Sequence, residues 1–102
     1  MTRFFKLAVA ATLGLSAAAA PPLQARDAAP FFTAELSQPA SESDVIAGGV
    51  VFRCEGTSCV APRSRDRALR VCKELRRKVG NIDSFTAGGE PISDKQLARC
   101  NS

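Results

Sequence analysis

Residues 50–60 read VVFRCEGTSCV, an apolar run and a cysteine, a four-residue polar insert that contains a glycine, then a second cysteine. Two β-prone runs on either side of a short glycine-bearing insert predict an antiparallel hairpin. In that hairpin Cys54 and Cys59 lie directly opposite each other, with Cβ atoms about 4.5–5.5 Å apart or closer. A disulfide needs roughly 3.5–4.5 Å between these atoms, so a small local adjustment joins the two residues.

The alternation along this hairpin predicts which side chains face the core. Successive residues of a strand point to opposite faces, so Cys54 shares its face with Ile46, Val50 and Phe52. We expect that face to form the floor of the core. Residues 45–54 are then one arm of the hairpin, with a bulge or a close backbone approach at its two adjacent glycines.

The flanking segments add two further strands. Residues 31–36 alternate between apolar and polar side chains, with Phe32, Ala34 and Leu36 on one face. The next segment, 37–44, is rich in turn-forming residues and is expected to be a loop. Strand-like composition resumes at 81–87, after which two adjacent glycines turn the chain.

Two helices are also expected. Apolar residues recur at helical spacing along 63–79, and Gly80 supplies the C-terminal stop. Ser93 caps a short second helix, with Gln96 three residues on as in a capping box. The sequence therefore predicts an α+β fold, in which an antiparallel sheet of three to four strands packs against one long helix, with a short C-terminal helix.

Residues 1–25 have the pattern of an export signal. Arg3 and Lys6 form a positive start, and 7–20 is an uncharged, apolar stretch. That stretch is shorter than the roughly 20 residues of a membrane-spanning helix, but it is typical of the core of a signal peptide. Cleavage is expected near Ala25, and the alternative is an uncleaved membrane anchor.

The expected mature chain is small. Without the signal, 26–102 carries 12 Lys and Arg against 10 Asp and Glu, a formal charge of +2. We expect 26–30 to be a flexible leader and 31–102 to be a single small domain. Domains below about 70–80 residues commonly need disulfides, metals or partners to stay folded. We expect this product in the periplasm or secreted, with no transmembrane segment in the mature chain.

All four cysteines lie in the mature part, and an even number is typical of disulfides in an exported protein. Three connectivities are open. We favour Cys54–Cys59 with Cys72–Cys100. In the other two connectivities the two opposed cysteines of the hairpin are not bonded to each other. The chain-entropy relation gives about 2 kcal/mol for the small ring and about 3.5 kcal/mol for the larger one.

Two other uses of the cysteines fit this sequence less well. Four thiolates can bind zinc, but the spacing C-x4-C-x12-C-x27-C fits no tight pair of zinc knuckles, and export favours oxidation. The hairpin pair is not the C-x-x-C of redox enzymes and does not open a helix. We therefore expect disulfides, no metal site and no cofactor.

The predicted long helix is basic, with eight cations against two acids in 63–78. The expected anion-binding residues are Arg63, Arg65, Arg67 and Arg70. The first three crowd the positive end of the predicted helix, as a site for phosphate or carboxylate groups would. An ordinary solvated face is the alternative. Nucleic acid is an unsuitable partner for an exported protein, which leaves an envelope protein or an anionic envelope lipid.

Enzyme chemistry has little support. The chain has no His, Trp or Tyr, so the commonest general base is absent. Ser58, Ser64 and Ser84 have no base at an evident spacing, and no glycine-rich phosphate loop is present. We expect no catalytic residues.

The runs VIAGGVVFRCEGTSCVA, ALRVCKELRRKVG, SFTAGG and LARCN, which lie between 45 and 101, resemble a family of short exported four-cysteine proteins of alphaproteobacteria. The resemblance implies the four-cysteine framework and the signal peptide, and it transfers no catalytic or binding residue. The interpretation is an exported, non-catalytic interaction or structural module. The alternative is an anion-binding module that uses the basic helix 63–78 at the cell envelope.

Overall fold

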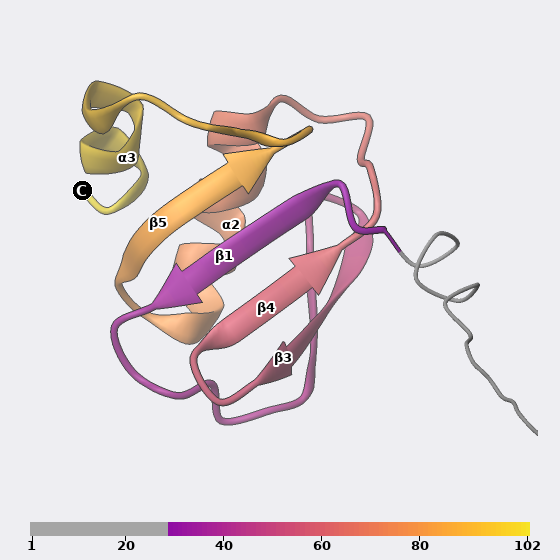
Figure 1. Ribbon diagram of the computed structural model, residues 1–102. Coiled ribbons are helices and arrows are strands. Elements are labelled where there is room, and N and C mark those ends of the chain that lie inside the picture. The colour runs from indigo at the N-terminus through magenta and orange to yellow at the C-terminus, as the bar shows by residue number, and fades with distance from the viewer. Residues whose placement is uncertain (1–28) are drawn as a thin grey trace, which may run out of the picture.

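The computed structural model describes residues 29–102. In this part of the chain six strands form one antiparallel sheet in the order β2-β3-β4-β1-β5-β6, accompanied by two helices (Figure 1). The expected signal peptide, 1–25, and the start of the leader lie outside the described residues. The elements are β1 (Phe32–Leu36), β2 (Asp44–Ala47), β3 (Val50–Glu55), β4 (Ser58–Ala61), α2 (Ala68–Val79), β5 (Ile82–Ala87), β6 (Glu90–Pro91) and α3 (Asp94–Cys100).

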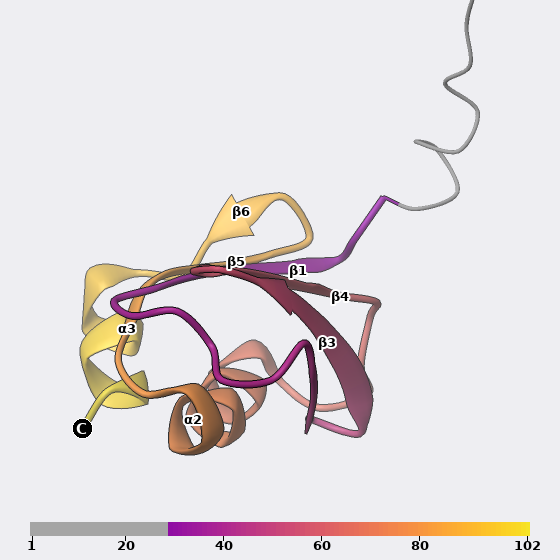
Figure 2. The ribbon, with the colours of Figure 1, turned by 90° about the horizontal axis from the view of Figure 1, so that it is seen from below.

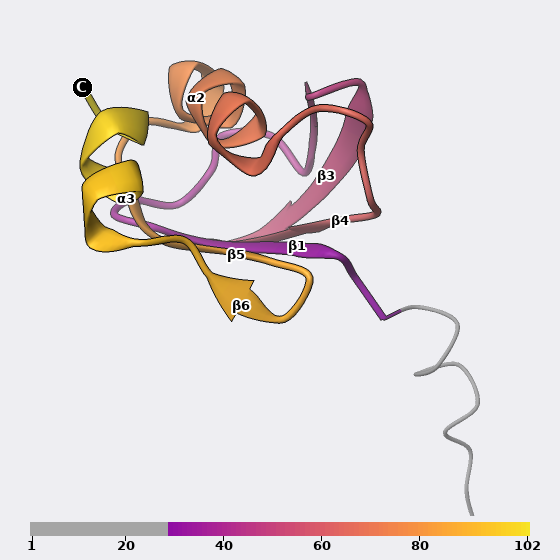
Figure 3. The ribbon, with the colours of Figure 1, turned by 90° about the horizontal axis from the view of Figure 1, so that it is seen from above.

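Both helices lie on one side of the sheet, and β6 turns toward the other side (Figures 2 and 3). The core fills the layer between the sheet and α2. Its centre is a cluster of three buried phenylalanines with ring centroids 5.6–6.5 Å apart: Phe32, Phe52 and Phe85. The face predicted for the first strand is confirmed, because Ala34 and Leu36 are buried beside Phe32.

The sheet is larger than expected, and the prediction of three to four strands on one long helix was wrong. Gly48 and Gly49 have φ values of 62° and 76° and form a two-residue turn, so the expected single arm 45–54 is two paired strands. Gly88 and Gly89, with φ of 62° and 85°, likewise return the chain from β5 into β6. Successive positive φ values suit glycine, and each pair adds a strand. The helices are short, at 12 and 7 residues.

The extra turn also changes which side chains of β2 are buried. Val45 pairs with Phe52 across the two strands, and Ile46 pairs with Val51. Directly opposed residues share a face, so Val45 is buried with Phe52, whereas Ile46 is 59% exposed. The expectation that Ile46 lies in the core floor was wrong, because a two-residue turn reverses the alternation that one continuous strand would have kept.

The long helix begins at Ala68, five residues later than the expected start at Arg63. The preceding segment is held in a turn, in which the Ser64 hydroxyl accepts a hydrogen bond from the Asp66 N–H at 3.0 Å. Serine side chains that bond to nearby backbone compete with helix formation in this way. Arg67 is the N-cap residue and has extended backbone angles.

The C-terminal helix is capped at its start and attached to the sheet at its end. Ser93 caps α3, as expected, by accepting a hydrogen bond from the Gln96 N–H at 3.1 Å. At the other end the Asn101 side chain bonds to both backbone groups of Ile82, with distances of 2.9 Å and 2.8 Å. Asn101 therefore pairs with the edge of β5 as a neighbouring strand would.

Candidate functional site

Both disulfides join buried cysteines. Cys54 and Cys59 form a directly opposed pair between β3 and β4, with their Cα atoms 4.0 Å apart. Cys72 of α2 is bonded to Cys100 of α3, with a Cα separation of 5.7 Å. This is the connectivity favoured from the sequence. Every cysteine sulfur is bonded to another sulfur, so none is a free thiolate that could bind zinc.

The four arginines proposed from the sequence divide into two groups. Arg63 lies in the segment between β4 and α2, and its guanidinium stacks over the Phe31 ring at 4.6 Å from the centroid. Such a cation–π contact is a structural role that the sequence did not indicate. Arg65, Arg67 and Arg70 line one open hollow of about 430 Å³.

Three further side chains line this hollow, and one of them is the acid Asp66. Lys73, one turn along α2 from Arg70, contributes a fourth cation, and half-buried Leu69 contributes an apolar wall. We call the exposed cations on this side of the molecule the basic face; they are Arg65, Arg67, Arg70, Lys73 and Arg77. Among residues 29–102, Arg70 is the member of the basic face that makes an ion pair.

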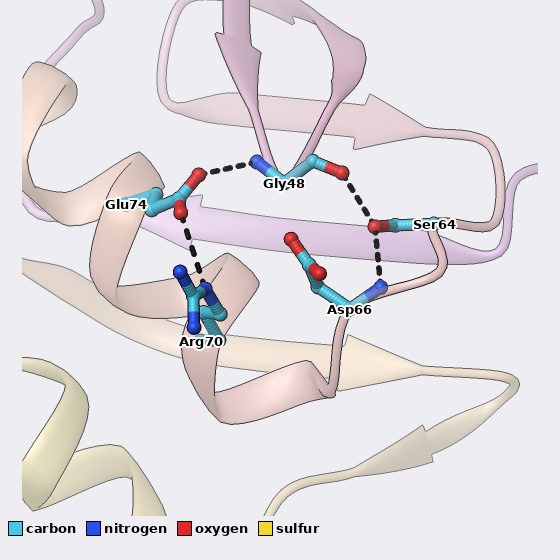
Figure 4. Close-up of polar contacts among 5 residues, drawn as sticks. All are labelled: Gly48, Ser64, Asp66, Arg70 and Glu74. Carbon is cyan, nitrogen blue, oxygen red and sulfur yellow. Dashed lines mark hydrogen bonds and ion pairs between the residues drawn. The ribbon is translucent and has the colours of Figure 1, made fainter.

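That ion pair belongs to a polar cluster that fastens the β2–β3 turn to α2 (Figure 4). Glu74 accepts a hydrogen bond from the Gly48 N–H at 2.7 Å and pairs with Arg70 at 3.5 Å. The Ser64 hydroxyl donates to the Gly48 carbonyl. The bond from Gly48, followed by the contact with Arg70, holds the pKa of Glu74 below its ordinary value.

Gly48 is the residue that this cluster requires. A Cβ at this position would lie 2.6 Å from Cγ2 of Val71, a residue buried in α2, and the backbone has φ of 62°. No side chain other than hydrogen therefore lets the turn approach the helix so closely. The cluster fixes the start of α2, and with it the basic face, against the sheet.

The outer face of the sheet, opposite the buried phenylalanines, carries a second surface feature. Ile46 and Val51 are 59% and 43% exposed, and they are the exposed large hydrophobic residues of the described chain. Half-buried Val60 lies on the same face. We call these three residues the apolar patch. Val51 and Val60 line an open hollow of about 740 Å³ with Val50, Arg53, Pro62 and other residues.

Sequence reasoning grouped all four arginines, and the structure brings Arg65, Arg67 and Arg70 to one hollow. It did not name Lys73, Glu74 or the apolar patch as site residues. The patch had a signal in the sequence, because a Gly-Gly pair between β-prone runs indicates a hairpin, which exposes Ile46. The hydrogen bond between Glu74 and Gly48 joins residues 26 positions apart, and no short-range sequence pattern predicts it. No helix formed by residues 29–102 is long and apolar enough to span a membrane.

A comparison with protein-family models matches residues 9–102 to one described as a family of unknown function (DUF8200). The match therefore includes every residue of the sheet and of both helices. No curated protein and no solved structure matches the chain.

Proposed function

We propose that this chain, which belongs to the family of unknown function DUF8200, is an exported, non-catalytic module that binds a protein partner through the outer face of its sheet. The observation that carries the proposal is the exposed pair of Ile46 and Val51. Contiguous apolar surface on a folded domain is a common mark of a binding site, because its burial against a partner is favourable.

The strands that carry the apolar patch are held rigidly. A disulfide joins β3 to β4, and the Gly48 hydrogen bonds hold the β2–β3 turn on α2. A surface that is already ordered loses little conformational entropy when a partner binds. The fold therefore supports recognition by a preformed surface.

The test compares two substitutions of cross-strand pairs on the same sheet face. Ile46→Thr with Val51→Thr removes the apolar pair and keeps β-branched side chains, and Glu35→Thr with Ser58→Thr alters an exposed pair on β1 and β4. Each protein is cross-linked in the periplasm of its native host. We expect a partner to be captured by the wild type and the control and lost from the first variant. A partner kept by both variants, or none with the wild type, would refute the proposal.

Export is the second part of the proposal, and two disulfides support it because they persist in oxidising compartments. The expected mature product begins at Arg26. Intact mass of the periplasmic or secreted product measures this start directly. A full-length mass, or recovery of the chain with the inner membrane, would contradict cleavage near Ala25.

A second candidate function is anion binding by the basic face. It is favoured by the convergence of Arg65, Arg67 and Lys73 on one hollow, where they make no ion pair with any described residue. Polyglutamate is a suitable probe, and its binding should weaken as ionic strength rises, since exposed charges are screened by salt. Polyglutamate binding that does not change with ionic strength, or no binding at low ionic strength, would exclude this function.

A further inference from the structure

We infer that the basic face docks on a membrane surface rich in anionic phospholipid, with the sheet turned away from the bilayer. This inference rests on the anion-binding function proposed above and names its ligand. It begins from the position of the cations on α2. The helix buries Val71 and Leu75 against the sheet, and its rotation of about 100° per residue places Arg70, Lys73 and Arg77 on the opposite side.

The charge of the described chain is segregated onto this side. Residues 29–102 contain 11 Lys and Arg and 9 Asp and Glu, a formal charge of +2. The five cations of the basic face, set against Asp66 and Glu74, give +3, so the remaining surface is close to neutral at −1. A molecule with this distribution orients in the field of a negatively charged surface with α2 toward it.

The arrangement of the cations fits an extended surface. They come from one helix and the segment just before it, and the hollow that four of them line is open. Cations spread along an exposed helix contact many headgroups at once, as basic helices do on anionic bilayers. Glu74, already counted in that charge of +3, does not line the hollow, and its carboxylate accepts a hydrogen bond from the Gly48 N–H.

The geometry also sets the orientation of the bound protein. Helix α2 covers one face of the sheet (Figures 2 and 3), and the strand register places Val51 and Val60 on the other. Docking by the basic face therefore leaves the outer-face residues Val51 and Val60 directed away from the bilayer. The molecule would display its partner-binding surface from the membrane.

The first experiment measures binding to vesicles of phosphatidylglycerol and of phosphatidylcholine. Two triple variants remove the same charge, one from the basic face (Arg65→Gln, Arg67→Gln, Lys73→Gln) and one from elsewhere (Arg53→Gln, Lys95→Gln, Arg99→Gln). We expect binding to phosphatidylglycerol alone, weakened about 100-fold in the first variant and far less in the second. Equal weakening would show that net charge decides binding and would overturn the inference.

Other probes separate this inference from the function on which it rests. Polyglutamate that binds through the same three cations, with no binding to phosphatidylglycerol vesicles, would overturn membrane docking and leave anion binding intact. Failure of both probes would refute both. Free inorganic phosphate at millimolar concentration should not displace the vesicles, and displacement would point to a site for single phosphate groups instead.

The second experiment tests orientation without removing any charge. The chain has no tryptophan, so single substitutions give unambiguous reporters. On phosphatidylglycerol vesicles, the fluorescence of Leu69→Trp, in the hollow that the basic face lines, should lose its quenching by acrylamide. That of Ser58→Trp, on the outer sheet face, should keep it. The reverse pattern would show that the sheet contacts the bilayer and would overturn the inference, even if a triple variant failed to fold.

Discussion

The two disulfides hold regions that differ in how much else supports them. Cys54–Cys59 joins β3 to β4, which are already paired by backbone hydrogen bonds along the hairpin, and β4 is paired again with β1. Cys72–Cys100 holds the seven-residue α3, whose other links to the domain include the Asn101 side chain and the hydrogen bond from the Ile92 N–H to the Phe85 carbonyl. A disulfide stabilises a region most where few other contacts hold that region in place.

The largest expected effect comes from removing each disulfide in turn. Cys72→Ala with Cys100→Ala should lower the free energy of unfolding by about 3.5 kcal/mol, because a 29-residue ring is opened, and Cys54→Ala with Cys59→Ala by about 2 kcal/mol. Thermal or urea unfolding of the two variants measures the difference. All four cysteines are buried, so the cavity terms are similar. A less stable hairpin variant would reverse the comparison.

The next effect tests the junction that carries no covalent bond, between the β2–β3 turn and α2. Gly48→Ala places a Cβ against Val71 and should cost about 3 kcal/mol from the clash and the left-handed backbone together. Gly49→Ala is the matched control, because its φ of 76° is also left-handed but its Cβ would meet open space. It should cost about 1 kcal/mol. Equal losses of unfolding free energy in the two variants would show that the close approach of Gly48 to Val71 adds nothing to the cost of the substitution.

A smaller effect sharpens the account of α3. Asn101→Ala leaves the buried backbone groups of Ile82 without their partner, which should cost about 1–2 kcal/mol. Ser102→Ala, which removes an exposed hydroxyl at the neighbouring position, should cost almost nothing. In the background that lacks Cys72–Cys100, loss of Asn101 should release α3, detected as faster amide exchange in 94–100. Additive effects in the two backgrounds would mean that the two attachments act independently.

These two regions also show how far the sequence could predict the fold. The Cys54–Cys59 hairpin, the burial of Phe32 and the cap at Ser93 depend on short-range patterns, and each was predicted correctly. The number of strands was predicted wrongly, although a local sequence pattern indicated it. Gly48-Gly49 was interpreted as a bulge and is a two-residue turn. That interpretation reversed the expected orientation of Ile46 and concealed one additional strand, and the turn at Gly88-Gly89 adds another.

The contacts that position the candidate sites were beyond reach of the sequence for a different reason. Asn101 bonds to Ile82 across 19 residues, and Glu74 bonds to Gly48 across 26. An Asn after a helix and a Glu within one are ordinary residues in those places, so nothing in the local pattern assigns a distant partner. The arginine cluster was anticipated from composition, but the structure assigns Arg63 to Phe31 and adds Lys73 to the hollow.

The smallest expected effect concerns the pH dependence of the β2–β3 junction. The pKa of Glu74 is lowered in the folded protein by the Gly48 N–H and by Arg70. A carboxyl whose folded pKa is depressed adds stability above its unfolded pKa, and that contribution is lost as the pH falls through the folded value. A Gln side chain does not titrate, so Glu74→Gln has no such contribution to lose in acid. The unfolding free energy of the variant should therefore fall less than that of the wild type between about pH 6 and about pH 3.

The matched control for this titration is Glu42→Gln, at an exposed residue outside the cluster. It makes the same substitution without touching the junction, so the difference between the two variants isolates the contribution of the cluster. If Glu74→Gln has the same profile as Glu42→Gln, the carboxylate adds nothing to folding beyond what a neutral acceptor supplies, and the turn is held by Ser64 and by packing on Val71. If its profile is flatter, as expected, the contact of Glu74 with Gly48 is the electrostatic part of the junction. The junction between the sheet and α2 would then weaken in acid, whereas neither disulfide depends on pH in this range.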